Sequence, residues 1–185
     1  MIFLNLLPSD SAGTATAYLC GVKTRMGYIG VDATADANCS MCLQLILLQG
    51  SDLTFFFLGT KQGHLEPIAK RATRTGKVAG VVTTTTITHA SPSPLYAKLP
   101  APLRPFEYRH QKYSKFEKDY SECDDIASQF VSNAQHLKVA FGGGRAYFTP
   151  DTENILVDRK KGLRNDGRNL IEVIFRLHSK TCNEF

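Results

Sequence analysis

The sequence predicts an α/β fold in which helices alternate with apolar strands on a mainly parallel sheet. Apolar runs of strand length lie at residues 78–82 and 137–141, and the second run ends at three glycines. Each run follows a segment whose apolar residues have helical spacing. This alternation is typical of an α/β sandwich. A chain of 185 residues with 43% apolar residues is long enough to form one domain with a core.

The first elements are a helix and a short strand. The helix is predicted over residues 12–20, and Gly21 is expected to end it. Ser11 is expected to cap the start of this helix, because a serine hydroxyl can accept a backbone N–H there. The strand is predicted at Tyr28–Val31, between two glycines.

Three further helices are predicted. One begins near Pro67, which suits a first helical turn, and ends at Gly76. Another covers residues 124–134, where two aspartates precede an apolar stripe and favour a helix N-terminus. Asp166 is expected to cap the last helix, which runs through Leu177.

The charge pattern does not favour nucleic-acid binding. The net charge is +5, but the basic residues are scattered. The densest run, Arg159 to Arg164, has acidic neighbours and is typical of a solvated loop. Because no aromatic side chains interleave with these charges to stack on bases, we expect no nucleic-acid partner.

The cysteines and the first residues leave several alternatives open. Five cysteines are present, and Cys39 and Cys42 have the spacing of half a zinc or redox motif that no second pair completes. Asn38 lies in a glycosylation sequon, which matters if the chain enters the secretory pathway. Residues 1–7 are apolar but short and lack a basic start, so they are not expected to be a signal peptide.

Residues 10–23 form the most informative segment. An acid and a serine open a run of small residues that predicts a tightly packed helix start. The unpaired N–H groups of such a start bind anions, so the hydroxyl of Ser11 would lie where a phosphate binds. A serine that only caps a helix is the ordinary interpretation when Asp-Ser-Ala is taken alone.

A second informative segment, residues 82–92, follows the predicted strand at its C-terminal end. Ligands of open α/β sheets bind at this edge. His89 and Ser91 lie two residues apart on an extended segment that Pro92 helps to fix. A lone histidine after a strand is more often structural than functional, and that alternative stays open on the residues alone.

Both segments closely resemble the metal-dependent alkaline phosphatases of animal type, and residues 123–127 and 139–145 extend the match. The resemblance implies an incomplete three-layer αβα sandwich, with residues 1–185 as one partial domain and an internal piece of a longer one. It implies hydrolysis of phosphate monoesters at two zinc ions and one magnesium ion. Ser11 would bind zinc and become transiently phosphorylated, and His89 and Ser91 would face the magnesium ion.

The same resemblance implies further site residues. Cys39 and Cys123 match a family disulfide, which would close a long loop. Arg104 is the nearest candidate for the arginine that clamps two phosphate oxygens, although the prolines around it depart from the family pattern. The resemblance also implies a homodimer on the extracellular face of the plasma membrane, held by a GPI lipid anchor that lies outside this chain.

Two apolar stretches, residues 43–48 and 53–58, do not fit the alternation or the resemblance. Each is far shorter than the roughly 20 residues that span a bilayer as a helix, and a polar turn separates them. A hairpin and a membrane-surface segment remain open. We interpret about residues 41–61 as an insertion that arises from translated non-coding sequence.

Two other functions remain as alternatives to a phosphatase. The first is a catalytically inactive product of a truncated or misassembled gene. Contiguous genomic sequence that encodes the missing Asp and His ligands would favour the enzyme over this alternative. The second is a serine esterase that uses Ser11 and His89, but the chain lacks the Gly-x-Ser-x-Gly elbow of that class.

Overall fold

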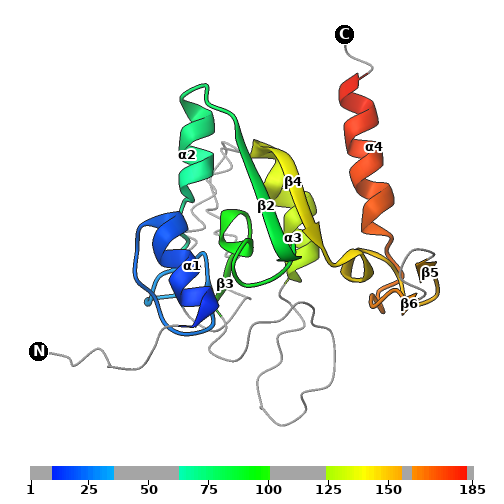
Figure 1. The fold of residues 1–185 in the computed structure, drawn as a ribbon, viewed down its shortest axis with the longest axis horizontal. Helices are drawn as coiled ribbons and strands as arrows, with labels where there is room; N and C mark the ends of the chain where they lie inside the picture. Colours follow the sequence, from blue (N-terminus) through cyan, green and yellow to red (C-terminus); the bar gives the residue numbers. More distant parts are fainter. Residues whose placement is uncertain (1–9, 36–62, 101–123, 156–159, 183–185) are drawn as a thin grey trace, which may run out of the picture.

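A parallel pair of strands, β2 (Ala79–Thr86) and β4 (Leu137–Gly143), forms the centre of the fold (Figure 1). The computed structural model describes residues 10–35, 63–100, 124–155 and 160–182. The pairing places Gly80 opposite Val139 and Val82 opposite Phe141, with irregularities near both ends. The remaining elements are α1 (Ser11–Cys20), β1 (Tyr28–Ile29), α2 (Ile68–Arg74), the 3₁₀ turn η2 (Ser93–Leu95), β3 (Leu99–Pro100), α3 (Ile126–Asn133), η3 (Ala134–His136), η4 (Arg145–Phe148), β5 (Asn154–Ile155), β6 (Lys160–Lys161) and α4 (Leu170–Cys182).

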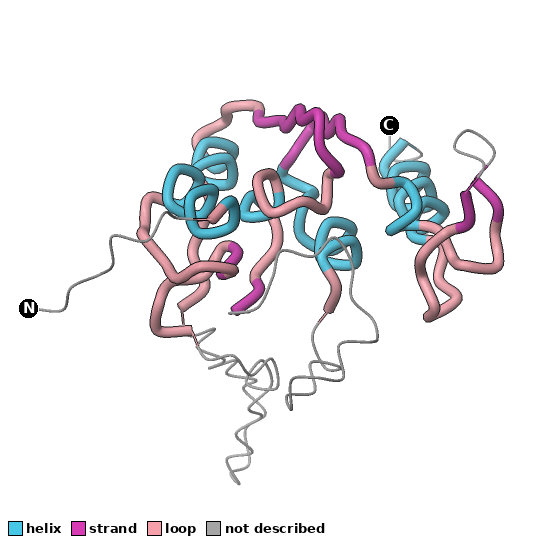
Figure 2. The backbone as a smooth tube through the Cα atoms, turned by 60° about the horizontal axis from the view of Figure 1, so that its bottom comes forward, coloured by secondary structure: helices cyan, strands magenta, loops and turns pink. Residues whose placement is uncertain are grey.

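The helices lie on one side of the parallel pair. Figure 2 shows β2 and β4 along the top of the molecule with α1, α2 and α3 beneath them. Val81 of β2 points into the core clusters on this side, whereas its neighbour Val82 is 76% exposed. The apolar run at residues 78–82 is of the type found in buried strands, whereas Val82 is exposed because nothing among the described residues covers the second face. The α/β class with a parallel pair is confirmed.

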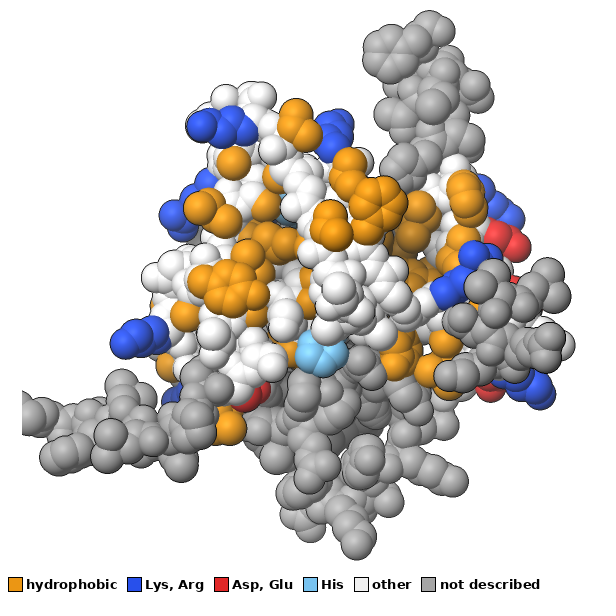
Figure 3. All heavy atoms as spheres, in the orientation of Figure 1, with side chains coloured by type: hydrophobic (Ala, Val, Ile, Leu, Met, Phe, Trp, Pro, Cys, Tyr) orange, Lys and Arg blue, Asp and Glu red, His pale blue; other side chains and the backbone are white. Residues whose placement is uncertain are grey.

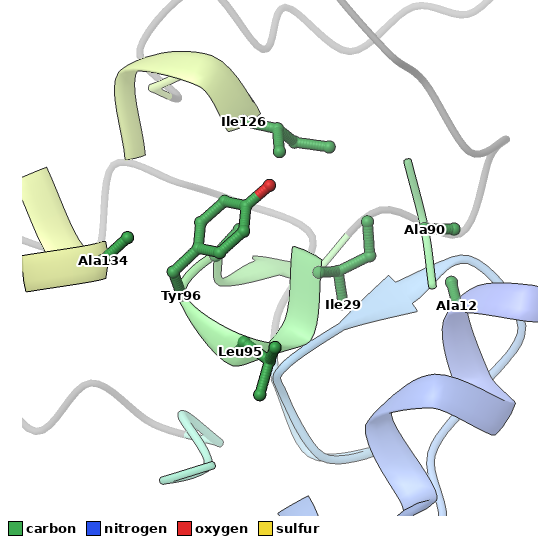
Figure 4. Packing of buried hydrophobic residues seen from close by; sticks show 8 residues of the cluster. Ala12, Ile29, Ala90, Leu95, Tyr96, Ile126 and Ala134 are labelled. Carbon is green, nitrogen blue, oxygen red and sulfur yellow. The ribbon is translucent and has the colours of Figure 1, made fainter. Parts of the chain in front are cut away.

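The main core cluster joins α1, β1, η2 and α3 (Figure 4). Tyr96 lies near its middle, with its ring edge-to-face on Phe130 at a centroid distance of 5.0 Å. Its hydroxyl donates a 2.5 Å hydrogen bond to the carbonyl oxygen of Ile87, just after β2. Burial raises the pKa of Tyr96 far above its ordinary value, so the phenol stays a donor. The buried members of the cluster are Ala12, Ile29, Ala90, Leu95, Tyr96, Ala97, Ile126 and Ala134.

The first helix ends at the predicted residue, but it begins one residue earlier than predicted and has a different cap. α1 ends where Gly21 adopts a left-handed conformation at φ +79°, which glycine does without strain. The cap residue is Asp10, whose carboxylate accepts the N–H of Gly13 at 2.9 Å. Ser11 is therefore the first helical residue rather than the cap, because the carboxylate one position earlier already binds that donor.

The last helix begins later than predicted. α4 starts at Leu170, and the side-chain oxygen of Asn169 accepts the N–H groups of Ile171 and Glu172 at 3.1 and 3.3 Å. The expected cap, Asp166, instead forms ion pairs with two arginines. The cap prediction is wrong because these charged partners compete successfully for the carboxylate.

The two remaining strand pairs are short and antiparallel. β1 pairs with β3, and β5 pairs with β6. No helix in the part of the chain that the structure describes is both long and apolar enough to cross a bilayer. Several predicted features lie outside the described residues: Asn38, Arg104, the Cys39–Cys123 disulfide and the insertion at about 41–61.

Candidate functional site

Ser11 lies exposed at the N-terminus of α1, next to a residue that fixes the start of the helix. The carboxylate of Asp10 accepts the N–H of Gly13 with one oxygen and the N–H of Gly27, at 2.8 Å, with the other. Asp10 thus joins the first turn of α1 to the turn that precedes β1. This double contact holds the backbone on which the serine hydroxyl is carried.

A buried threonine ties the same helix to β1. The hydroxyl of Thr16 donates to the carbonyl oxygen of Tyr28 at 3.1 Å and accepts the N–H of Gly30 at 2.9 Å. Because Thr16 is fully buried, both bonds are shielded from water. The helix that carries Ser11 is therefore anchored at its start by Asp10 and in its middle by Thr16.

His89 lies in the turn that follows β2, between two buried neighbours. Its backbone N–H donates to the carbonyl oxygen of Thr86 at 3.0 Å, and its carbonyl accepts the N–H of Ser93 at 3.1 Å. The ring nitrogen Nδ1 is buried and has no hydrogen-bond partner among the described residues. A buried polar atom without a partner is costly unless a ligand or water contacts it, so this nitrogen is suited to bind a further group.

The structure brings the segment of His89 and Ser91 against the start of α1. Ala12 follows Ser11 and Ala90 lies between His89 and Ser91; both are almost fully buried in the same core cluster (Figure 4). Farther along α1, the hydroxyl of Tyr18 reaches the carbonyl oxygen of Ser91 at 3.5 Å. The two segments singled out by their sequence are therefore neighbours in space.

The donor atoms of this region suit magnesium better than zinc. Magnesium takes oxygen ligands and keeps several waters, so the Ser91 hydroxyl and a water on His89 fit such an ion. Zinc takes several nitrogen, sulfur or carboxylate ligands. The sequence predicts a single zinc-binding side chain, that of Ser11. Within the described ranges, no group of three or more His, Cys, Asp or Glu side chains is placed to hold a metal ion.

A buried ion-pair cluster lies between α3 and the loop before α4. The guanidinium of Arg164 donates two hydrogen bonds to the carboxylate of Asp125, at 3.1 and 2.9 Å, and also contacts both oxygens of Asp166. The side chains of Arg164 and Asp125 are only 5% and 8% exposed. Asp125 is also the N-cap of α3, where it accepts the N–H of Ser128 at 3.0 Å.

The protonation states of this cluster follow from its contacts. Burial alone raises the pKa of Asp125, but the hydrogen bonds from Arg164 and Ser128 and the arginine charge outweigh it, so the pKa lies below its ordinary value. Burial alone lowers the pKa of Arg164, whereas its two aspartate partners raise it above its ordinary value. All three groups of the Arg164–Asp125–Asp166 cluster are therefore charged at neutral pH.

Sequence reasoning missed this cluster. It treated Arg164 as part of a solvated basic loop, and this is wrong, because the residue is buried against two carboxylates. The pattern Arg164, Asp166, Arg168 places opposite charges two residues apart, and that alternation was the available signal. It could not have identified Asp125, which is distant in the sequence.

Comparison with known proteins identifies one family. The family model described as alkaline phosphatase matches residues 5–183. A membrane-bound alkaline phosphatase of Bombyx mori is 39% identical over 174 residues, which cover 91% of this chain and 28% of the relative. The tissue-nonspecific isozyme of Felis catus is 35% identical over 168 residues, again covering 28% of the relative. The chain thus spans between a quarter and a third of the length of these curated relatives.

Solved structures show the same fold. The alkaline phosphatase of the Antarctic bacterium TAB5 matches with a TM-score of 0.53 and 23% identity, covering 92% of this chain and 32% of the other. The enzyme of Thermus thermophilus matches with a TM-score of 0.51. The match of the family model over nearly all residues, together with these relatives, leads to one conclusion. The chain belongs to the alkaline phosphatase family.

Proposed function

We propose that the domain to which this chain belongs hydrolyses phosphate monoesters and that Ser11 is its nucleophile. Family membership supports the reaction class. The observation that supports the residue assignment is that Ala12, next to Ser11, and Ala90, between His89 and Ser91, belong to one core cluster. The inactive-product alternative has no comparable observation in its favour.

The proposed reaction has two displacements at phosphorus. In the first, the oxygen of Ser11 loses its proton and forms a bond to phosphorus while the bond to the ester oxygen breaks, and the leaving oxygen takes up a proton and departs as an alcohol. In the second, water attacks the phosphoserine and inorganic phosphate leaves. The serine is restored, so the net reaction converts the phosphate monoester and one water molecule into an alcohol and inorganic phosphate. Asp10 and Thr16 position the helix that carries the serine.

We further propose that His89 and Ser91 hold a magnesium ion. The unpartnered Nδ1 of His89 and the hydroxyl of Ser91 support this assignment. A bound divalent cation supplies positive charge that stabilises the developing charge on phosphate oxygens. A solved structure of a TAB5 variant is described as having magnesium bound. Two zinc ions remain part of the proposal by family resemblance, with Ser11 as one of their ligands.

The remaining family features are proposals of the same kind. They are phosphate clamping by Arg104, a Cys39–Cys123 disulfide, glycosylation at Asn38, a homodimer, and attachment to the extracellular face of the plasma membrane through a GPI anchor. A relative named as membrane-bound supports the membrane association. The family provides no support for a nucleic-acid partner.

The test uses a chimera in which residues 10–182 replace the matching segment of the Bombyx mori relative. Incubation with radiolabelled inorganic phosphate at mildly acidic pH is expected to label Ser11, and peptide mapping locates the label. The Ser11→Ala variant is expected to lose the label and keep its thermal unfolding temperature. Label that persists in this variant would refute the assignment, and Thr14→Ala, three residues along α1, is the matched control.

A further inference from the structure

The backbone of Ile87 is held from two sides just after β2. Its N–H donates to the carbonyl oxygen of Gly143, in β4, at 2.9 Å. Its carbonyl oxygen accepts the hydroxyl of Tyr96 at 2.5 Å. Gly142 lies so close that an added Cβ would come within 3.2 Å of the backbone nitrogen of Ile87. Ile87 is therefore a fixed point between the parallel pair and Tyr96.

The hydrogen bond from Tyr96 to Ile87 closes a loop of chain, residues 87–96, that contains both His89 and Ser91. Within this loop the carbonyl oxygen of His89 accepts the N–H of Ser93 at 3.1 Å, and that of Ser93 accepts the N–H of Tyr96 at 3.0 Å. A short segment that is bonded at its ends and in its middle has few backbone conformations. The relative placement of His89 and Ser91 therefore depends on the bonds that close the loop.

The core holds the aromatic ring of Tyr96, whereas no charge holds the loop. The ring packs edge-to-face on Phe130 of α3, and Phe130 packs in the same way on Phe148 at a centroid distance of 5.8 Å. Among the described residues, no ion pair involves residues 87–96. Figure 3 shows mainly uncharged polar and backbone atoms at the surface around the C-terminal end of β2. The loop is thus placed by neutral hydrogen bonds, and the bond from Tyr96 joins it to the core.

We propose that Tyr96 is a positioning residue whose hydroxyl holds the loop in the conformation in which His89 and Ser91 bind magnesium. This inference rests on the magnesium site proposed above. The phenol does not itself contact the ion but acts through the carbonyl of Ile87, two residues before His89. Partners that orient metal ligands without touching the metal change metal affinity by about 10- to 100-fold when they are lost.

Tyr96→Phe in the chimera defined above tests the role of the hydroxyl, because it keeps the aromatic ring and its packing. Tyr28→Phe is the matched control: both tyrosines are 2% exposed, and the hydroxyl of Tyr28 also donates to a backbone carbonyl, that of Ala35, at 3.4 Å. Each substitution is expected to lower the midpoint of thermal unfolding by less than about 4 °C. Overall stability therefore does not distinguish the two variants, and local readouts are needed.

The first readout is amide hydrogen exchange of the chimera without magnesium, which depends on neither the metal nor the reaction. In Tyr96→Phe, the backbone amides of His89 and Ser93 are expected to exchange faster, on the order of fivefold, because the loop is no longer closed. In Tyr28→Phe, the same amides are expected to exchange as in the unmodified chimera. Unchanged exchange in Tyr96→Phe would overturn the positioning role, whatever the function of the domain.

The second readout is the affinity for magnesium, measured by calorimetric titration of the magnesium-depleted chimera with magnesium chloride. Tyr96→Phe is expected to weaken the affinity about tenfold, and Tyr28→Phe to leave it unchanged. Equal weakening in both variants would overturn the inference. If Ser91→Ala weakens the affinity and Tyr96→Phe does not, the inference about Tyr96 fails and the magnesium site stands. If neither substitution changes the affinity, the magnesium site itself is refuted, and the inference with it.

Discussion

Arg164 and Asp125 form a bidentate, buried ion pair that joins the N-terminus of α3 to the loop before α4. The pair links two parts of the chain that are distant in the sequence, because Asp125 caps α3 while Asp166, the second partner of Arg164, lies in the loop that leads to α4. The contact between α3 and α4 is therefore fixed by charge as well as by apolar packing around Leu170.

Removal of one member of this pair is expected to destabilise the fold strongly. Arg164→Met leaves the buried carboxylate of Asp125 without its partner, and the free energy of unfolding is expected to fall by about 3–5 kcal/mol. Denaturant unfolding of the chimera measures the change. Arg176→Met, which breaks an exposed pair with Glu172 in α4, is the matched control and is expected to change stability by less than about 1 kcal/mol. Equal effects of the two variants would contradict a role of burial.

The same cluster predicts loss of stability in acid. The pKa values of Asp125 and Asp166 lie below their ordinary values in the folded protein, so the unfolded chain takes up protons first as the pH falls. Their contribution to the free energy of unfolding is complete above about pH 5. It is lost as the pH falls below about 4, toward the pKa values of the folded state. Unfolding measured from pH 7 to pH 3 tests this. Asp166→Asn removes one of these groups and is expected to give a shallower decline; an unchanged slope would exclude Asp166 as a contributor.

Asp10 is expected to stabilise α1 through both of its carboxylate oxygens. Asp10→Ala removes the contacts to Gly13 and Gly27 and is expected to cost about 1–2 kcal/mol. Asp10→Asn keeps one accepting oxygen for the helix cap and replaces the other with an amide donor. It is therefore expected to give an intermediate loss in the same denaturant measurement. A loss for Asp10→Asn as large as that for Asp10→Ala would contradict a separate contribution from the cap.

Magnesium dependence is expected to report on His89 and Ser91. In the chimera, Ser91→Ala removes an oxygen ligand and is expected to lower phosphatase activity in a way that excess magnesium partly restores. His89→Ala is expected to shift the magnesium titration in the same direction. Ser93→Ala, two residues beyond Ser91, serves as the control. Titrations that coincide with the unmodified chimera for both variants would exclude these residues as magnesium ligands.

The 185-residue chain alone is expected to show no turnover of an aryl phosphate at alkaline pH. A serine hydroxyl without an activating partner is a weak nucleophile, and the described residues include no cluster of metal ligands. The assay is run with added zinc and magnesium, and Ser11→Ala controls for contaminating phosphatases. Robust activity that disappears in Ser11→Ala would contradict this expectation.

Local signals were sufficient to predict the elements that they determine. Gly21 ends α1, the apolar stripe of α3 follows its aspartate cap, and the runs of β2 and β4 form strands. The β1–β3 pair could not be predicted, because Leu99–Pro100 is too short to show a period and its partner is distant in the sequence. The start of α4 was mispredicted because Asp166 was available both as a cap and as a partner for arginine.

The candidate site was predictable residue by residue but not as an arrangement. Ser11, His89 and Ser91 were identified from their own segments, and those assignments stay predictions. Their proximity depends on the burial of Ala12 and Ala90 in one cluster, and two alanines carry no signal of mutual contact. Arg164 was missed for a related reason, since its partner Asp125 belongs to another element.

The burial of Ala12 and Ala90 has a consequence for how this region can vary. Both residues are buried in one cluster with only a methyl group as side chain, so α1 and the turn after β2 pack together through small side chains. The span between the backbone segments that carry Ser11 and His89 thus depends on this packing. A larger side chain at either alanine would push the two segments apart and lengthen that span without altering any reacting group.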